Sequence, residues 1–172
     1  AKTREEVSKG VVRGSFTSVG ALESSLRHAC PHMPDGTSPR PLNRFGVRQK
    51  GKLRAIDDGR GNGANRATFM HETVTTPSFF FVAVAARAHV LAAASLGALP
   101  PVLSSALADL AMAYRTVPTS QPWYTSVAFF DPLASPPGPR YFWLPGHNFG
   151  LLAAVVNFNR YPELVVVAVR AP

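Results

Sequence analysis

The chain has few cysteines and few acidic side chains, and charge interrupts its apolar stretch. Cys30 is the single cysteine in 172 residues, which excludes an internal disulfide. The sequence has ten Asp and Glu and eighteen Lys and Arg, which gives a net charge of +8 and a pI near 10.4. This excess favours a polyanionic partner such as nucleic acid. The apolar run 79–99 carries Arg87 and His89 near its middle, so we expect no membrane span.

The N-terminus lacks the apolar core of a secretory signal, because Lys2 and Arg4 are followed by acidic residues. This pattern favours an intracellular protein over a secreted one. The first residue is Ala1, so we expect a processed or partial product.

A metal site at the cysteine is weakly indicated. His28, Cys30 and His32 alternate, so in a strand they would share a face and could meet a metal ion. Structural zinc needs four ligands, and no fourth ligand or paired cysteine motif follows. We therefore expect a buried free thiol between two surface histidines.

Periodicity predicts two helices in the first hundred residues. Residues 1–16 have mixed charge and are expected to be partly ordered. Thr17 is expected to cap a helix over 17–30. A second, Ala-rich helix is expected over 77–99, with Gly97 able to close it.

Between these helices, residues 44–58 alternate apolar and basic side chains, which predicts a two-stranded hairpin that turns at Lys50-Gly51. Val47, Leu53 and Ile56 are expected to face inward. The basic side chains are expected on the other face or at the tip, where they would clamp phosphates: Arg48, Lys50, Lys52 and Arg54.

The second half predicts a further hairpin. Residues 123–130 and 140–144 are aromatic and β-branched, and a proline-rich loop separates them. Residues 149–160 have helical spacing. For residues 103–114 propensity favours a helix.

Three motifs, taken in order, resemble the fingers and palm of a retroelement reverse transcriptase. They are Lys52-Leu-Arg-Ala-Ile-Asp-Asp58, then Asp109-Leu-Ala-Met-Ala-Tyr-Arg-Thr-Val-Pro118, then Leu144-Pro145 with Phe149-Gly150. The resemblance runs from about Glu6 to Arg160. It implies an α+β fold, with residues 1–100 as a fingers-like region and 101–172 as a partial palm with a short antiparallel sheet. It also implies a strand through 107–110, which we adopt over the helix.

The resemblance assigns roles to individual residues. Asp109 would be the catalytic carboxylate and a ligand of Mg²⁺, the ion that nucleotidyl transfer requires. Tyr114 would lie beneath the incoming sugar, with Phe149 and Gly150 beside the nucleotide. Lys52 and Arg54 would bind the triphosphate, and Arg48 and Lys50 the nucleic-acid backbone.

The chain departs from the family pattern at two places. Residues 146–148 interrupt the Leu-Pro-Phe-Gly motif, and no Tyr-x-Asp-Asp motif follows it in the 172 residues. Asp57-Asp58 looks like that acidic pair, but motif order places it in the fingers, where Asp57 is expected to pair with a basic neighbour.

The sequence therefore predicts a reverse-transcriptase-like fragment whose partners are RNA or an RNA–DNA hybrid and deoxynucleotides, and which lacks polymerase activity by itself. A non-catalytic basic nucleic-acid-binding module is the alternative, and a decayed retroelement product is another.

Overall fold

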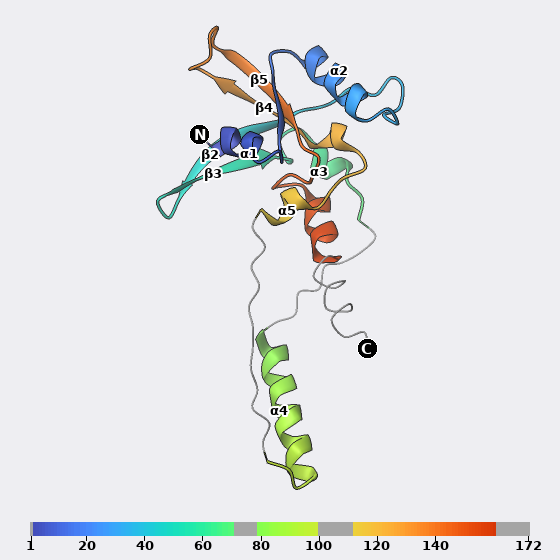
Figure 1. The fold of residues 1–172 in the computed structure, drawn as a ribbon, viewed down its shortest axis with the longest axis vertical. Coiled ribbons are helices and arrows are strands. Elements are labelled where there is room, and N and C mark those ends of the chain that lie inside the picture. The colour runs from blue at the N-terminus through green and yellow to red at the C-terminus, as the bar shows by residue number, and fades with distance from the viewer. Residues whose placement is uncertain (1, 71–78, 100–111, 161–172) are drawn as a thin grey trace. The chain divides into compact units, whose positions relative to one another are not determined.

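The computed structural model describes residues 2–70, 79–99 and 112–160. The chain divides into two compact units, one made of Ala1–Glu72 with Met112–Pro172 and the other of Thr73–Ala111. The larger unit combines helices with a mixed β-sheet (Figure 1). This confirms the predicted α+β class, whereas the assignment to polymerase fingers and palm stays a prediction.

The sheet has five strands in the order β1-β5-β4-β2-β3. These strands are β1 (Arg13–Phe16), β2 (Leu42–Gln49), β3 (Lys52–Asp58), β4 (Ser126–Asp131) and β5 (Gly138–Trp143). The pairs β1–β5, β4–β5 and β2–β3 are antiparallel, and β2–β4 is parallel. Both predicted hairpins are therefore confirmed, and they belong to one continuous sheet.

Each face of the sheet has its own core. Trp143 packs with Leu22 and Leu26 of α2 (Val19–Ala29). Its neighbour Phe142 points to the opposite face, because side chains alternate along a strand, and packs there with Leu42, Val127 and residues of the N-terminal segment. The part of the sheet around β4 and β5 is thus packed on both sides, and the N-terminal segment is part of the fold.

The N-terminal segment contains α1 (Lys2–Ser8) and β1. The cap of α2 is one residue later than predicted, because the backbone N–H of Ala21 donates to Ser18 Oγ at 3.1 Å. Thr17 is therefore outside the helix.

The predicted turn of the β2–β3 hairpin is confirmed, but the predicted inward face is wrong. Lys50 and Gly51 both have positive φ, 49° and 73°, as a two-residue hairpin turn requires. Val47 lies opposite Arg54, so the two share a face. Val47 and Leu53 are 40% and 53% exposed. They remain exposed because β4 pairs with β2 only at Leu42 and Asn43, and no sheet neighbour reaches the tip.

The smaller unit contains α4 (Phe79–Ser95), which confirms the predicted helix with shorter bounds. Gly97 closes it as predicted. Its φ is 64°, its N–H donates to the carbonyl of Ala94, and the N–H of Ala98 donates to that of Ala93, which is the Schellman arrangement. None of the described helices has both the length and the apolar character needed to cross a membrane.

The second half follows the predicted order of elements with one correction. Pro122–Thr125 forms a 3-10 turn, η1, so the strand begins at Ser126 and not at Trp123. The Thr125 hydroxyl donates to the carbonyl of Leu144 at 2.7 Å, which holds this turn against the end of β5. Residues 152–160 are helical, as predicted.

Two short helices lie near the motifs, α3 (Ala64–Ala67) and α5 (Ala113–Thr116). The strand expected through 107–110 lies outside the described residues.

Candidate functional site

The expected catalytic residue, Asp109, lies outside the described residues. In the described ranges, no three His, Cys, Asp or Glu side chains are grouped so as to hold a metal ion. The Mg²⁺ site therefore stays a prediction.

Four of the five basic residues of the β2–β3 hairpin are exposed: Arg48, Lys50, Lys52 and Arg54. The register sets Lys52 opposite Gln49 and Arg54 opposite Val47, so these two cations share one face. Arg48 lies opposite Leu53 on the other face. Within the described part of the chain, none of the four forms an ion pair, so their charges face solvent.

Tyr114, Phe149 and Gly150, which the motifs assign to the nucleotide pocket, lie close together. The rings of Tyr114 and Phe149 meet edge to face with centroids 5.0 Å apart. The guanidinium carbon of Arg115 lies 5.4 Å from the centroid of Phe149, within reach of a cation–π interaction.

Gly150 is required by its surroundings. Its φ is 95°, and a Cβ there would collide with the carbonyl oxygen of Asp57. Its own carbonyl accepts from Asn65 Nδ2 at 2.8 Å, and Asn65 Oδ1 accepts the N–H of Leu152 at 2.9 Å. The loop after β3 is thereby docked onto the Phe149-Gly150 motif.

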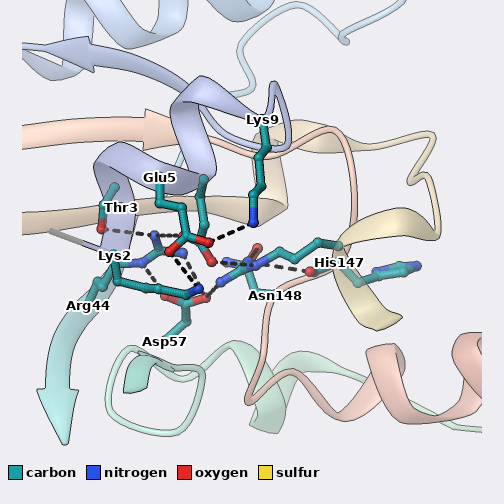
Figure 2. A network of polar contacts seen from close by, with 10 residues as sticks. Lys2, Thr3, Glu5, Lys9, Arg44, Asp57, His147 and Asn148 are labelled. Carbon is teal, nitrogen blue, oxygen red and sulfur yellow. Dashed lines mark hydrogen bonds and ion pairs between the residues drawn. The ribbon is translucent and has the colours of Figure 1, made fainter. Parts of the chain in front are cut away.

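A network of four buried charges lies beside this motif, and we call it the buried quartet: Glu6, Arg44, Asp57 and Arg115. Arg44 Nε donates to Asp57 Oδ1 at 2.6 Å, and Arg44 Nη1 donates to Glu6 Oε2 at 2.8 Å. Arg115 Nη2 donates to Asp57 Oδ2 at 2.8 Å. Figure 2 shows Arg44 and Asp57 from the hairpin strands beside α1, with Asn148 also part of the network.

Both oxygens of Asp57 are occupied by guanidinium groups, which confirms that Asp57 pairs with basic residues. It also leaves Asp57 poorly placed to bind a metal ion. Burial works to lower the pKa of Arg44, but the hydrogen bond and charge of Asp57, with Glu6 behind it, outweigh burial and leave that pKa raised. The quartet thus pairs two basic side chains with two acidic ones.

The exposed face of α1 carries a separate charge cluster. Glu5 Oε1 lies 2.7 Å from Lys9 Nζ, and Glu5 Oε2 lies 2.9 Å from Lys2 Nζ. The hydrogen bonds and charge of Lys9 and Lys2 lower the pKa of Glu5 to about 2. The two lysines are thus paired at the surface (Figure 2).

The three residues that interrupt the Leu-Pro-Phe-Gly motif are buried beside the quartet. A Cβ at Gly146 would collide with the carbonyl oxygen of Arg115. The N–H of His147 donates to the carbonyl of Tyr114 at 3.0 Å, and burial lowers the pKa of His147. Asn148 Oδ1 accepts from Arg115 Nη1 at 3.4 Å. The interruption therefore helps to position Arg115.

Among the residues that the structure describes, two buried side-chain atoms lack a hydrogen bond, Arg115 Nε and Asn148 Nδ2. Arg115 Nε is still 3.5 Å from Glu6 Oε1. That distance allows charge attraction, although the pair lacks hydrogen-bond geometry, so we treat it as an ion pair only.

Sequence reasoning missed four of these participants: Glu6, Arg44, Arg115 and Asn148. Glu6 and Arg115 meet Asp57 and Arg44 across long sequence separations, so no local pattern marks them. Asn148 lies between His147 and Phe149 in a mostly apolar stretch. A polar amide at this place was the sequence signal that could have pointed to it.

The prediction for Cys30 is confirmed. Cys30 is buried, and burial raises its pKa. His28 and His32 are exposed, and His32 Nε2 lies 2.9 Å from the carbonyl oxygen of Ser120.

Comparison of the chain with family models, curated proteins and solved structures gives no match. The resemblance to reverse transcriptases therefore stays a prediction from the order of the motifs.

Proposed function

We propose that the chain binds a nucleic-acid strand through the β2–β3 hairpin, as a fingers-like part of a reverse-transcriptase-like polymerase. One observation carries the proposal: the hairpin extends beyond its sheet neighbours and exposes four basic side chains that have no acidic partner among the described residues (Figure 1). Such a projection brings several cations to a phosphate backbone at once.

The distribution of charge supports this proposal. Arg44 and Arg115 are neutralised inside the buried quartet, and Lys2 and Lys9 share Glu5. The basic side chains at the hairpin tip have no acidic partner among the described residues. Their positive charge therefore remains available to a ligand.

The nucleotide-binding role of Tyr114, Phe149 and Gly150 is part of the proposal. Their mutual contact supports it, as does the docking of the Asn65 loop on Gly150. Catalysis needs convergent carboxylates around Mg²⁺, and Asp109 is the one that the motifs supply. We therefore propose that the chain binds template and nucleotide and does not transfer nucleotides by itself.

The test is fluorescence anisotropy with labelled single-stranded RNA over a range of salt concentrations. We expect affinity to fall as salt rises, because neutralised phosphates release counterions. Changing Lys50, Lys52 and Arg54 together to Ala should reduce the slope of log K against log salt by about 2, since each phosphate contact on a single strand contributes roughly 0.7.

The matched control removes three exposed basic residues elsewhere, Arg13, Arg40 and Arg66. Equal losses from both triple variants would show diffuse charge attraction and would overturn the hairpin as the binding element.

A parallel primer-extension assay with Mg²⁺ and deoxynucleotides should give no product. Extension that Asp109→Asn abolishes would overturn the inactivity and establish Asp109 as catalytic.

A further inference from the structure

The two hairpins of the sheet diverge and leave a cavity between them. β2 and β4 pair only at Leu42↔Val127 and Asn43↔Ala128, and beyond these pairs their tips point apart (Figure 1). The space between them has a volume of about 480 Å³, and we call it the wedge. Side chains that decide its chemistry are Arg4, Phe45, Arg54, Phe130, Asp131 and Leu133.

The wedge exposes aromatic surface. Phe130 is 65% exposed and Phe45 is 45% exposed, and both line the cavity. Their neighbour Phe129 is partly buried and stacks on Phe142 with ring centroids 5.4 Å apart. The fold thus uses Phe129 for its core and leaves Phe130 open to a planar ligand.

The charge around these rings is positive. Arg4 of α1 and Arg54 of β3 line the wedge, are exposed, and form no ion pair within the part of the chain that the structure describes. The acid of the wedge, Asp131, accepts the backbone N–H of Leu133 through Oδ1 at 3.0 Å, which fixes the loop after β4. An occupant with flat rings and negative charge matches this lining.

We propose that the wedge binds an unpaired base of a single-stranded nucleic acid, with the base stacked on Phe130 and the adjoining phosphates at Arg4 and Arg54. Base stacking on an exposed aromatic ring is a general means of binding single strands. Bases within a duplex are stacked on one another, so a duplex does not offer such a face. This inference rests on the proposed function and names the form of nucleic acid that the hairpin binds.

The experiment uses the full chain and two labelled probes of about 12 nucleotides, within the usual site size of single-strand binders. One probe is oligouridylate, and the other is the same ribose-phosphate chain without bases. Phe130→Ala should weaken oligouridylate binding roughly tenfold. It should leave binding of the abasic probe unchanged, because the phosphate contacts remain.

Tyr124→Ala is the matched control, since Tyr124 is 58% exposed on η1 and does not line the wedge. It should bind both probes as the unchanged chain does. Arg54→Ala should weaken both probes, and a fully paired duplex of the same length should be insensitive to Phe130→Ala.

The outcomes separate the two proposals. If Phe130→Ala binds oligouridylate as well as the unchanged chain while the hairpin triple variant weakens it, the base subsite is overturned and the proposed function stands. If the unchanged chain shows no salt-dependent binding of either probe, both are overturned. The unchanged chain should bind oligouridylate more tightly than the abasic probe, and Phe130→Ala should lose this preference. That result supports the subsite and does not depend on the absolute affinity. Displacement of oligouridylate by an acidic peptide with equal dependence on Phe130 would overturn the assignment to nucleic acid.

Discussion

The two ends of the β2–β3 hairpin carry similar residues in opposite environments. At its base, Arg44 is 5% exposed and lies opposite Asp57, which is 1% exposed. At its tip, Arg48, Lys50 and Lys52 face solvent. Both ends carry basic side chains, yet the basic residue at the base serves stability, and those at the tip are available to a ligand.

This difference shows that a basic residue indicates a binding site only when it is known to lack an acidic partner within the fold. A buried guanidinium needs nearby carboxylates, because desolvation of an unpaired charge is costly. An exposed one has no such requirement.

The largest effect is expected from Asp57→Asn. This change leaves two buried arginines with the single carboxylate of Glu6, so unfolding free energy should fall by about 3 to 5 kcal/mol. Urea unfolding followed by the fluorescence of the buried residues Trp123 and Trp143 measures it.

Asp58→Asn is the control for that change. Asp58 Oδ1 accepts the backbone N–H groups of Arg60 and Gly61, and an Asn oxygen keeps this capacity, so the loss should stay below about 1 kcal/mol. Equal losses in the two variants would contradict the role given to the quartet.

A smaller effect is expected from His147, through pH. Burial lowers its pKa in the folded chain from 6.5, so the unfolded chain takes up the proton more readily. The stability that neutral His147 contributes is fully present above about pH 6.5 and is lost as pH falls through the folded pKa. His147→Gln should therefore lose less stability than the unchanged chain between pH 7 and pH 5.

His28→Gln serves as the reference for this measurement, because His28 is exposed. It should keep the pH profile of the unchanged chain. A His147→Gln profile that coincides with both would refute the assignment of acid sensitivity to His147.

The smallest effect on stability is expected at the tip. Changing Lys50, Lys52 and Arg54 to Ala removes exposed side chains, so unfolding free energy should change by no more than about 0.5 kcal/mol for each. Thermal and urea unfolding test this directly. A loss as large as that of Asp57→Asn would show that the tip belongs to the core of the fold and would remove the contrast between the two ends.

Much of the fold in both units follows from local sequence signals. The turn at Lys50-Gly51, the hairpin of β4 and β5 and the closure of α4 at Gly97 are each marked by residues adjacent in the chain. The pairing of Asp57 with a basic residue also followed from motif order, although its two partners did not.

The remaining features depend on neighbours distant in sequence. Val47 and Leu53 alternate like buried residues, but their burial depends on whether another strand or helix reaches the tip, and β4 does not. The contact of Glu6 with Arg44 and that of Arg115 with Asp57 likewise form only when the sheet is assembled. Asp109 remains a prediction of the motif alone.

The buried quartet has a consequence for the order in which the chain is made. Glu6, Arg44 and Asp57 are all synthesised before Arg115, which follows Asp57 after 58 residues. Until Arg115 arrives, the base of the hairpin holds an acid without its second partner, and burying it is unfavourable. We therefore expect the base of the hairpin to be buried only after Arg115 has been made, which is later than the synthesis of the unit Thr73–Ala111.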